Sequence, residues 1–461
     1  MTKYQLNQNG PFISCVISGN YLVMRKWMKS IIIVMTCCGS LFMVSCNRPE
    51  MNMKSLINTD HLDHLYDEFE FNGQPAALIY IYADYPDYAP IVAPGEGIAC
   101  VDDMARAVIF YLRYYKYRGG EVHLLKARRL LNMILMMQAD NGFFYNFIDE
   151  HSLIEKDTPN SRPEGNWWSW RAMWAIAEAY DFWREQDEDF GRRLNESMQR
   201  ALVPVRVMDN MYLQKVMDQD HLWPGWLPQQ YAADQAAVLL MALVPYFRSS
   251  GDTTLLPIID HLGQGILAMQ IRDRNHYTDG AFLSWPMLWH AYGNSQASAL
   301  LLSFPIVQDV TLLHSARYEI EQFYPALMQR RFRNYLIFDQ LKDPVVIKEE
   351  RQFEQIAYGI RPMVWAALAA YEITGQENFA IQAAEIALWL LGKNPAGQMM
   401  YDPKTGRCYD GIDSAEDVNY NSGAESTIEA LLTLLEIEKC APANRHLFSC
   451  LINSGVVQPY E

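Results

Sequence analysis

The sequence is poor in positive charge. Its 461 residues include 38 lysines and arginines against 54 aspartates and glutamates, so the formal net charge is -16 with neutral histidines. No stretch gathers its basic residues into the kind of stripe that neutralises the phosphates of a nucleic acid. Nucleic acid is therefore not an expected partner of this chain.

Cysteine is also scarce beyond the first fifty residues. Only four of the eight cysteines lie there, namely Cys100, Cys408, Cys440 and Cys450. Their wide spacing fits neither a disulfide-stapled scaffold nor the paired spacing of a zinc site. The sequence therefore predicts no metal and no cofactor.

A long apolar run is lacking as well, because the apolar segment at residues 30–42 is too short for a comfortable membrane span. It follows a cationic head that begins at Met24, and it ends in Met43-Val44-Ser45-Cys46. This order is typical of an export signal and resembles a bacterial lipoprotein signal. The resemblance implies that Cys46 is acylated and anchors the protein in the bacterial cell envelope, and an uncleaved membrane anchor is the alternative.

The chain divides into three expected parts. Residues 1–45 form the leader, residues 46–75 a polar tether with an amphipathic helix at His61–Phe69, and residues 76–461 one folded domain. The domain opens with a short β-prone segment at residues 76–82, and three prolines then prevent a helix before residue 97. Because a tether precedes it, the domain suits an anchored protein.

Hydrophobic residues are abundant, at 50% of the chain, and they recur with a long period. Six polar or glycine-bearing positions, spaced 62 to 66 residues apart, each begin a segment rich in Ala, Ser and Gly: Asp102, Trp168, Ala232, Asn294, Gly359 and Ser422. Small residues allow inner helices to approach closely, and the longer charged segments between them suit an outer layer. The repeat predicts one all-α domain, an (α/α)6 toroid of six helical hairpins.

Three motifs accompany this period: Val101–Ala107, Tyr401–Gly411 and Asn419–Thr427. Together with Leu391-Gly392-Lys393-Asn394-Pro395, they resemble the six-hairpin glycosidase superfamily over about residues 76–439. The resemblance implies a carbohydrate substrate. It does not decide the reaction, because related toroids include lyases and epimerases.

Two groups of carboxylates become neighbours if the ring closes, since the first and sixth inner helices then meet. Asp102 and Asp103 begin the first helix, and Glu425 begins the sixth. Glycoside hydrolysis needs two carboxyl groups, about 6.5 to 9.5 Å apart in inverting enzymes. We expect Asp102 or Asp103 to act as the base and Glu425 to hold the proton, with Asp410 in reserve.

Structural roles are the alternatives for these acids. Asp102 suits a helix N-cap, and Ser422-Gly423-Ala424-Glu425 matches a capping box. The two interpretations predict different results when Asp103 or Glu425 is replaced by its amide. Turnover should be abolished if these acids are catalytic, whereas only stability should fall if they are caps. The loop around Asp402 and Asp410 lacks the ligand order of a calcium loop.

Aromatic and charged residues near the helix starts are candidates for substrate binding, namely Trp168, Trp170, Arg171, Asp234, Trp285, Trp289 and Arg361. Aromatic faces stack on sugars, although core packing is the alternative for any one Trp. The two arginines suit an acidic sugar or an ion pair with Asp102, Asp103 or Glu425. His290 and Tyr292 are the proton-transfer candidates for a lyase.

The sequence thus favours a glycoside hydrolase. A polysaccharide lyase or epimerase on the same toroid is the first alternative, and a glycan-binding protein without chemistry is the second. The identity of the sugar and the oligomeric state do not follow from these residues.

Overall fold

The computed structural model describes residues 55–93, 95–218, 221–342 and 344–455. These residues belong to one compact unit, Met53–Pro459. The leader and Cys46 lie outside the described residues. No helix in the described ranges combines the length and the apolar character needed to span a membrane.

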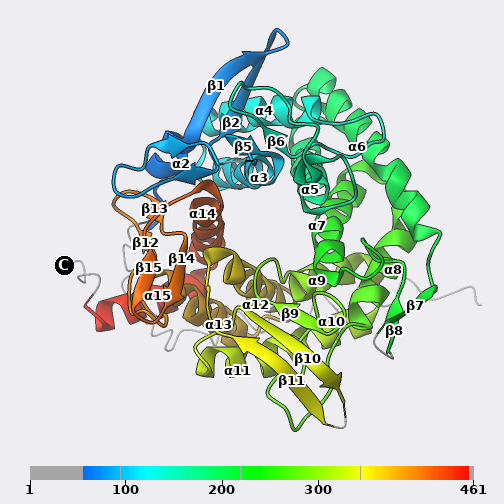
Figure 1. Ribbon diagram of the computed structural model, residues 1–461, viewed down its shortest axis with the longest axis vertical. Helices are drawn as coiled ribbons and strands as arrows, with labels where there is room; N and C mark the ends of the chain where they lie inside the picture. Colours follow the sequence, from blue (N-terminus) through cyan, green and yellow to red (C-terminus); the bar gives the residue numbers. More distant parts are fainter. Residues whose placement is uncertain (1–54, 94, 219–220, 343, 456–461) are drawn as a thin grey trace, which may run out of the picture. The chain divides into compact units, whose positions relative to one another are not determined.

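Six helices form an inner ring within this unit (Figure 1): α3 (Val101–Arg118), α5 (Trp167–Trp183), α7 (Ala233–Ser250), α9 (Gln296–Val307), α12 (Arg361–Thr374) and α14 (Ala424–Lys439). Each contacts the next, and α14 contacts α3, so the ring closes. Every helix starts within two residues of a position that the sequence period marks. The predicted toroid is confirmed.

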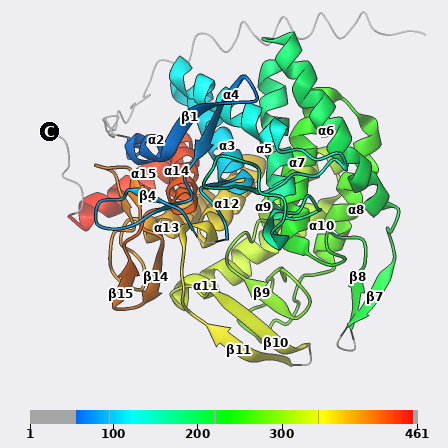
Figure 2. The same ribbon diagram turned by 45° about the horizontal axis from the view of Figure 1, so that its top comes forward.

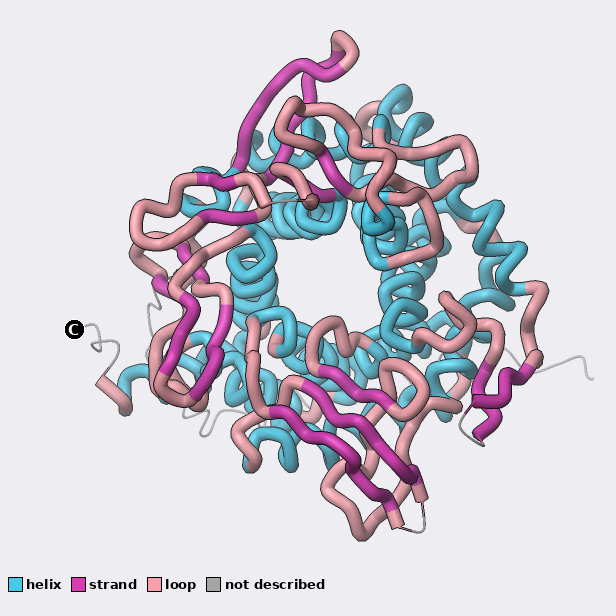
Figure 3. Tube along the Cα trace, viewed as in Figure 1, coloured by secondary structure: helices cyan, strands magenta, loops and turns pink. Residues whose placement is uncertain are grey.

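A second ring surrounds the first (Figure 3): α4 (Glu121–Met136), α6 (Glu188–Asp209), α8 (Leu256–Leu267), α10 (Val310–Tyr318), α13 (Glu377–Ala387) and α15 (Ala441–Asn453). After α10 the chain continues through a π-helical turn, η3 (Glu319–Phe323), into α11 (Tyr324–Gln329). Outer helices such as α6 bury one stripe, including Leu194, Met198 and Leu202, and expose the other face. Inner helices such as α7 are buried almost throughout, which explains their small residues.

Short antiparallel strands connect the helices: β1 (Tyr66–Phe71) with β2 (Gln74–Ile79), β3 (Tyr82–Ala83) with β4 (Pro90–Ile91), β5 (Ala99–Cys100) with β6 (Phe147–Ile148), β7 (Lys215–Asp218) with β8 (His221–Pro224), β9 (Leu288–His290) with β10 (Tyr335–Leu341) and β11 (Val345–Arg351), β12 (Tyr401–Asp402) with β13 (Arg407–Cys408), and β14 (Gly411–Ser414) with β15 (Asp417–Asn419). The 3-10 turns are η1 (Pro159–Ser161), η2 (Thr253–Leu255), η4 (Ala357–Gly359) and η5 (Leu388–Leu390). Three hairpins, β7–β8, β10–β11 and β14–β15, project to one side of the ring (Figure 2).

The region before the ring differs from the predicted tether. Within the described residues the first helix is α2, which spans Asp60–Leu65, and β1 replaces the second half of the predicted helix. The helix packs on the ring: His61 Nε2 lies 2.8 Å from the Ser422 carbonyl oxygen, and the Tyr111 hydroxyl donates to Asp63 over 3.0 Å. The boundary predicted at residue 76 is therefore wrong, since residues 55–75 belong to the folded unit. The extended segment at 76–82 is confirmed as parts of β2 and β3.

Candidate active site

Two cavities lie at opposite ends of the inner ring. One, of about 410 Å³, is lined mostly by the middle and second halves of the six inner helices, including Arg113 and Glu436. The other, of about 380 Å³, is lined by the starts of α3 and α14 and by the loops and strands beside them. The inner helices therefore run in one direction, and the second cavity lies at their N-terminal end, where helix dipoles favour negative charge.

This second cavity, hereafter the acidic cavity, is lined by seven carboxylates, namely Glu96, Asp102, Asp103, Glu354, Asp410, Asp413 and Glu425. Arg106 is the one Lys or Arg among the lining residues in the described part of the chain. All four acids predicted to be catalytic, Asp102, Asp103, Asp410 and Glu425, lie in it. Their roles in chemistry remain predictions.

At the start of α3 the helix cap is not an aspartate. Cys100 is the N-cap residue: its sulfur accepts from the Asp103 backbone N–H over 3.4 Å, and its thiol donates to Asp103 Oδ2 over 3.2 Å. Asp102 instead forms an ion pair with Arg171, 2.6 Å from Nη1 to Oδ1. The capping role considered for Asp102 is thus wrong, and both aspartates are held by side chains.

At the start of α14 the cap comes from another loop. Asp410 Oδ1 accepts from the Gly423 backbone N–H and from the Ser426 hydroxyl, both over 2.8 Å. A Cβ atom at Gly423 would lie 2.6 Å from the Ile81 carbonyl oxygen, so glycine is needed for this close approach. Glu425 makes no capping bond, and the capping-box interpretation is wrong.

Glu425 is held instead by Arg106, a buried residue that the sequence analysis did not select. The two terminal nitrogens of Arg106 lie 2.7 Å from Asp103 Oδ1 and 2.7 Å from Glu425 Oε2, while Nε lies 3.1 Å from Glu429 Oε1. One guanidinium therefore joins the first and last inner helices. The sequence did contain a signal for this ion-pair network. Arg106 follows Asp103 by three residues and Glu429 follows Glu425 by four, so each pair lies on one helix face.

Two more buried arginines complete the network. Arg171 donates to the Tyr358 hydroxyl, and Arg361 pairs with Glu429. The Tyr358 ring lies 4.8 Å from the Arg106 guanidinium and 5.0 Å from that of Arg171. Buried charges are tolerated only when they are paired, so these contacts explain how three guanidinium groups occupy the centre of the ring.

Burial raises the pKa of three of the cavity's acids, Asp103, Asp410 and Asp413. It raises the pKa of Asp103 to about 6, an effect that Arg106 opposes and Glu425 reinforces. It also raises the pKa of Asp410, against the hydrogen bonds from Gly423 and Ser426, and Glu425 adds to the increase. Glu425 keeps 39% of its side chain exposed and is ion-paired. Burial thus favours the protonated forms of Asp103 and Asp410, neither of which the sequence analysis chose as the first proton donor.

The residues predicted to bind substrate do not line this cavity. The indole of Trp168 donates to the Phe144 carbonyl, that of Trp170 to Gln235 and that of Trp285 to Asp234, while Trp289 lies in the core. Arg171 and Arg361 are used in the buried ion pairs. Hydrogen bonds and ion pairs to neighbouring parts of the fold therefore occupy these side chains, and their role in substrate binding stays a prediction.

His290, the proton-transfer candidate, is also occupied. Its Nε2 lies 2.9 Å from Asp234 Oδ2, and its Nδ1 lies 2.8 Å from the Tyr292 carbonyl oxygen. The ring stacks on Tyr292 with centroids 3.9 Å apart. No histidine lines the acidic cavity within the described residues.

An exposed aromatic pair lies beside the acidic cavity instead. Tyr85 is 60% exposed and Tyr420 42% exposed, and their ring centroids are 5.9 Å apart. Tyr409, next to Asp410 in sequence, packs edge-on against Tyr420 at 5.0 Å. Because the pair combines residues from two ends of the sequence, the helical repeat did not reveal it.

Comparison with known proteins gives the fold. No family model matches the sequence, and no curated protein is similar enough in sequence to be matched. Among solved structures, cellobiose 2-epimerase from Bacillus thermoamylovorans B4167 matches with a TM-score of 0.58 and 12% identity, covering 82% of this chain and 95% of that chain. The protein is an (α/α)6 toroid.

Two further matches agree. A D-mannose isomerase aligns with a TM-score of 0.51 and 14% identity over 78% of this chain and 91% of that one. A family 76 glycoside hydrolase from a bovine Bacteroides thetaiotaomicron strain aligns with a TM-score of 0.52 and 12% identity over 84% of this chain and 78% of that one. At such identities the toroid is shared, and the chemistry must be argued from the acidic cavity.

Proposed function

We propose that this protein hydrolyses a glycosidic bond in a neutral saccharide, with Asp410 and Glu425 as the carboxyl pair. The observation that carries the proposal is the position of both acids at the N-terminus of α14, in one cavity but in different environments. Glycosidases place their two acids in different environments, because this keeps one carboxyl group protonated while the other is a carboxylate.

Asp410 is the proton donor in this proposal. Burial raises its pKa, and its two hydrogen bonds both go to Oδ1, so Oδ2 is available to the substrate. Glu425 is the carboxylate that activates water or attacks carbon, because Arg106 holds one of its oxygens while the side chain stays partly exposed. Asp103 acts through Arg106, and it is a positioning residue.

The charge of the cavity supports a neutral substrate. Seven carboxylates against one arginine disfavour a uronate or a sulfated sugar, whose charge would be repelled. Arg106 is already shared among three carboxylates, so it is not free to bind an anionic sugar. This argues against the lyase alternative if its substrate is a uronate. The exposed rings of Tyr85 and Tyr420 offer a stacking surface at the edge.

Epimerisation is the alternative that the fold comparison raises. Moving a proton at carbon usually employs an imidazole near neutral pH. His290, which both Asp234 and Tyr292 hold, is not free for that role. The arrangement therefore favours hydrolysis over epimerisation.

A panel of neutral and uronate-containing oligosaccharides tests the proposal. Hydrolysis creates a new reducing end without ultraviolet absorbance, and a lyase creates a new reducing end together with an ultraviolet-absorbing unsaturated sugar. An epimerase changes a sugar without a new reducing end, and a binding protein gives none of these products. We expect new reducing ends without ultraviolet absorbance, and from neutral substrates only. Any of the other products, or binding without turnover, would contradict the proposal.

Two variants test the residue roles. Glu425→Gln and Asp410→Asn should each lower kcat by about 100- to 10,000-fold, the usual effect of removing a general acid or base. Asp410→Asn should also lower the melting temperature, because it weakens the cap of α14. Asp417→Asn is the control, since Asp417 is an exposed acid on neighbouring β15 outside the cavity lining. Normal turnover in Glu425→Gln would refute its assignment.

A further inference from the structure

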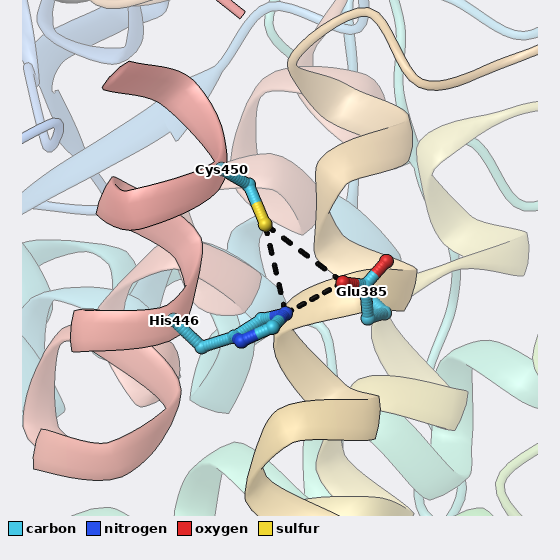
Figure 4. A group of neighbouring side chains, drawn as sticks. All are labelled: Glu385, His446 and Cys450. Carbon is cyan, nitrogen blue, oxygen red and sulfur yellow. Dashed lines mark hydrogen bonds and ion pairs between the residues drawn. The ribbon is translucent and has the colours of Figure 1, made fainter. Parts of the chain in front are cut away.

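Three side chains of different chemistry meet between the outer helices α13 and α15, as Figure 4 shows. His446 Nε2 lies 2.5 Å from Glu385 Oε1. Cys450 Sγ lies 3.6 Å from the same nitrogen and 3.8 Å from the same oxygen. None of the three lines the acidic cavity.

The helices explain this meeting. His446 and Cys450 are four residues apart on α15, so both face one side of the helix. Glu385 comes from α13, which packs directly against α15. The sequence spacing of the cysteines gave no sign of a metal site, because the third side chain belongs to a different hairpin.

The arrangement does not fit a proton relay. In a relay from a thiol through an imidazole to a carboxylate, the two partners use different ring nitrogens. Here Cys450 and Glu385 both face Nε2 of His446. A single nitrogen cannot donate to the carboxylate and accept from the thiol at once, so the thiol donates to Glu385 Oε1 instead of to the ring. One sulfur, one nitrogen and one oxygen atom, all able to bind a metal, thus face a common point.

We propose that Glu385, His446 and Cys450 bind a zinc ion, with water at a fourth position. Thiolate, imidazole and carboxylate are the ligands that Zn²⁺ takes, at about 2.3 Å for sulfur and about 2.0–2.2 Å for nitrogen and oxygen. A tetrahedron with those bond lengths separates its ligand atoms by roughly 3.2–3.6 Å. The two sulfur distances are already close to this range, and only the nitrogen–oxygen contact has to open.

Neighbouring contacts agree with this assignment. Lys393 pairs with Glu385 Oε2, which orients the carboxylate and leaves Oε1 for the ion. The side chains of Glu385 and His446 are 23% and 30% exposed, so an ion and its water have access. Calcium and magnesium prefer six or more oxygen ligands, and the cluster offers a carboxylate oxygen but also nitrogen and sulfur.

Binding would release the thiol proton of Cys450 to solvent and leave His446 as a neutral ligand. The ion would then join the fifth and sixth hairpins through their outer helices. Such a link stabilises the folded chain in proportion to its occupancy, without touching the acidic cavity.

Cobalt is a spectroscopic probe for this site, because a cobalt–thiolate bond gives a charge-transfer band in the near ultraviolet. We expect metal-free full-length protein to gain this band on titration with Co²⁺, and Zn²⁺ to remove it by displacement. Cys450→Ser should lose the band, and His446→Ala should bind Co²⁺ at least tenfold more weakly. Zinc should raise the melting temperature of the wild-type chain but not of Cys450→Ser.

Cys440→Ser is the matched control, because Cys440 precedes the same helix but lies outside the cluster. It should keep the band and the thermal shift. All variants retain Cys15, Cys37, Cys38 and Cys46, so the difference between variants isolates Cys450. A band that survives in Cys450→Ser, or no band in the wild-type chain, would overturn the proposal. Circular dichroism checks folding, and His446→Ala, a change at a partly exposed position, provides an independent variant.

Discussion

At the scale of single residues, Asp103 is one of the groups that make the stability of the ring depend on pH. Burial raises its pKa to about 6, above the ordinary value of 3.8. Its contribution to the free energy of unfolding is therefore complete below about pH 4 and is lost as the pH rises through 6. A shift of this size corresponds to about 3 kcal/mol.

Asp103→Asn mimics the neutral acid and should remove this dependence. We expect the wild-type chain to lose stability relative to the variant between pH 4 and 7, measured by denaturant unfolding at several pH values. Other titrating groups are present in both proteins, so they cancel in the difference. Parallel stability curves would mean that Asp103 is ionised throughout this range.

The residues of the cavity could be predicted in part. Asp102, Asp103 and Glu425 meet as expected, because ring closure brings the first and last inner helices together. Asp410 joins them from the loop before β14. The indoles of Trp168 and Trp170 lie outside the lining of the acidic cavity for a physical reason. A residue at the start of an inner helix faces either the cavity or the next hairpin, and the helical period does not distinguish these directions.

At the scale of secondary structure, the fourth hairpin departs from the regular repeat. Its outer layer is interrupted by the π-helical turn η3, which begins at the buried Glu319. The carboxyl group of Glu319 accepts from the Phe282 backbone N–H over 2.9 Å and from the Tyr324 hydroxyl over 3.3 Å. Burial raises the pKa of Glu319 to about 8, so the acid is neutral at physiological pH.

Glu319→Gln should therefore keep the turn and remove its sensitivity to alkali. Because the pKa of Glu319 is raised, its stabilising contribution is complete below about 4.5 and disappears as the pH rises through 8. We expect the melting temperature of the wild-type chain to fall relative to Glu319→Gln between pH 6 and 9. Glu321→Gln, at an exposed position in the same turn, should follow the wild-type curve.

The inner helices could be predicted from the sequence, but most of the strands could not, apart from the extended segment at residues 76–82. Six helix starts follow from the recurrence of small residues, since inner helices cannot pack closely without them. Hairpins such as β10–β11 and β14–β15 lie in the connections, where no period repeats. Their residues pair locally and carry no signal that depends on the ring. The domain boundary predicted at residue 76 differs from the structure for a related reason. The contact of His61 with Ser422 joins distant parts of the sequence, so no local pattern reveals it.

At the scale of the whole molecule, the buried charges connect the beginning of the ring to its end. The buried Arg106 joins α3 to α14 near the acidic cavity. Farther along α3, the partly buried Arg113 pairs with Glu436 of α14 and with Glu178 of α5. Breaking one partner of a buried pair typically costs about 3–5 kcal/mol. The contact between the first and last inner helices, which closes the ring, is therefore stabilised by ion pairs at two positions along α3 as well as by apolar packing.

At this scale the sequence also bears on whether the whole protein is attached to a membrane. The segment from Met24 to Cys46 has the order of a lipoprotein signal, and we propose that a lipid on Cys46 anchors the protein in a bacterial envelope. Cys46→Ala removes the acylated sulfur and should release the protein from the membrane fraction. Cys38→Ala changes another leader cysteine and should leave fractionation unchanged. If Cys46→Ala stays with the membranes as the wild-type chain does, the apolar segment itself is the anchor and the lipoprotein assignment is wrong.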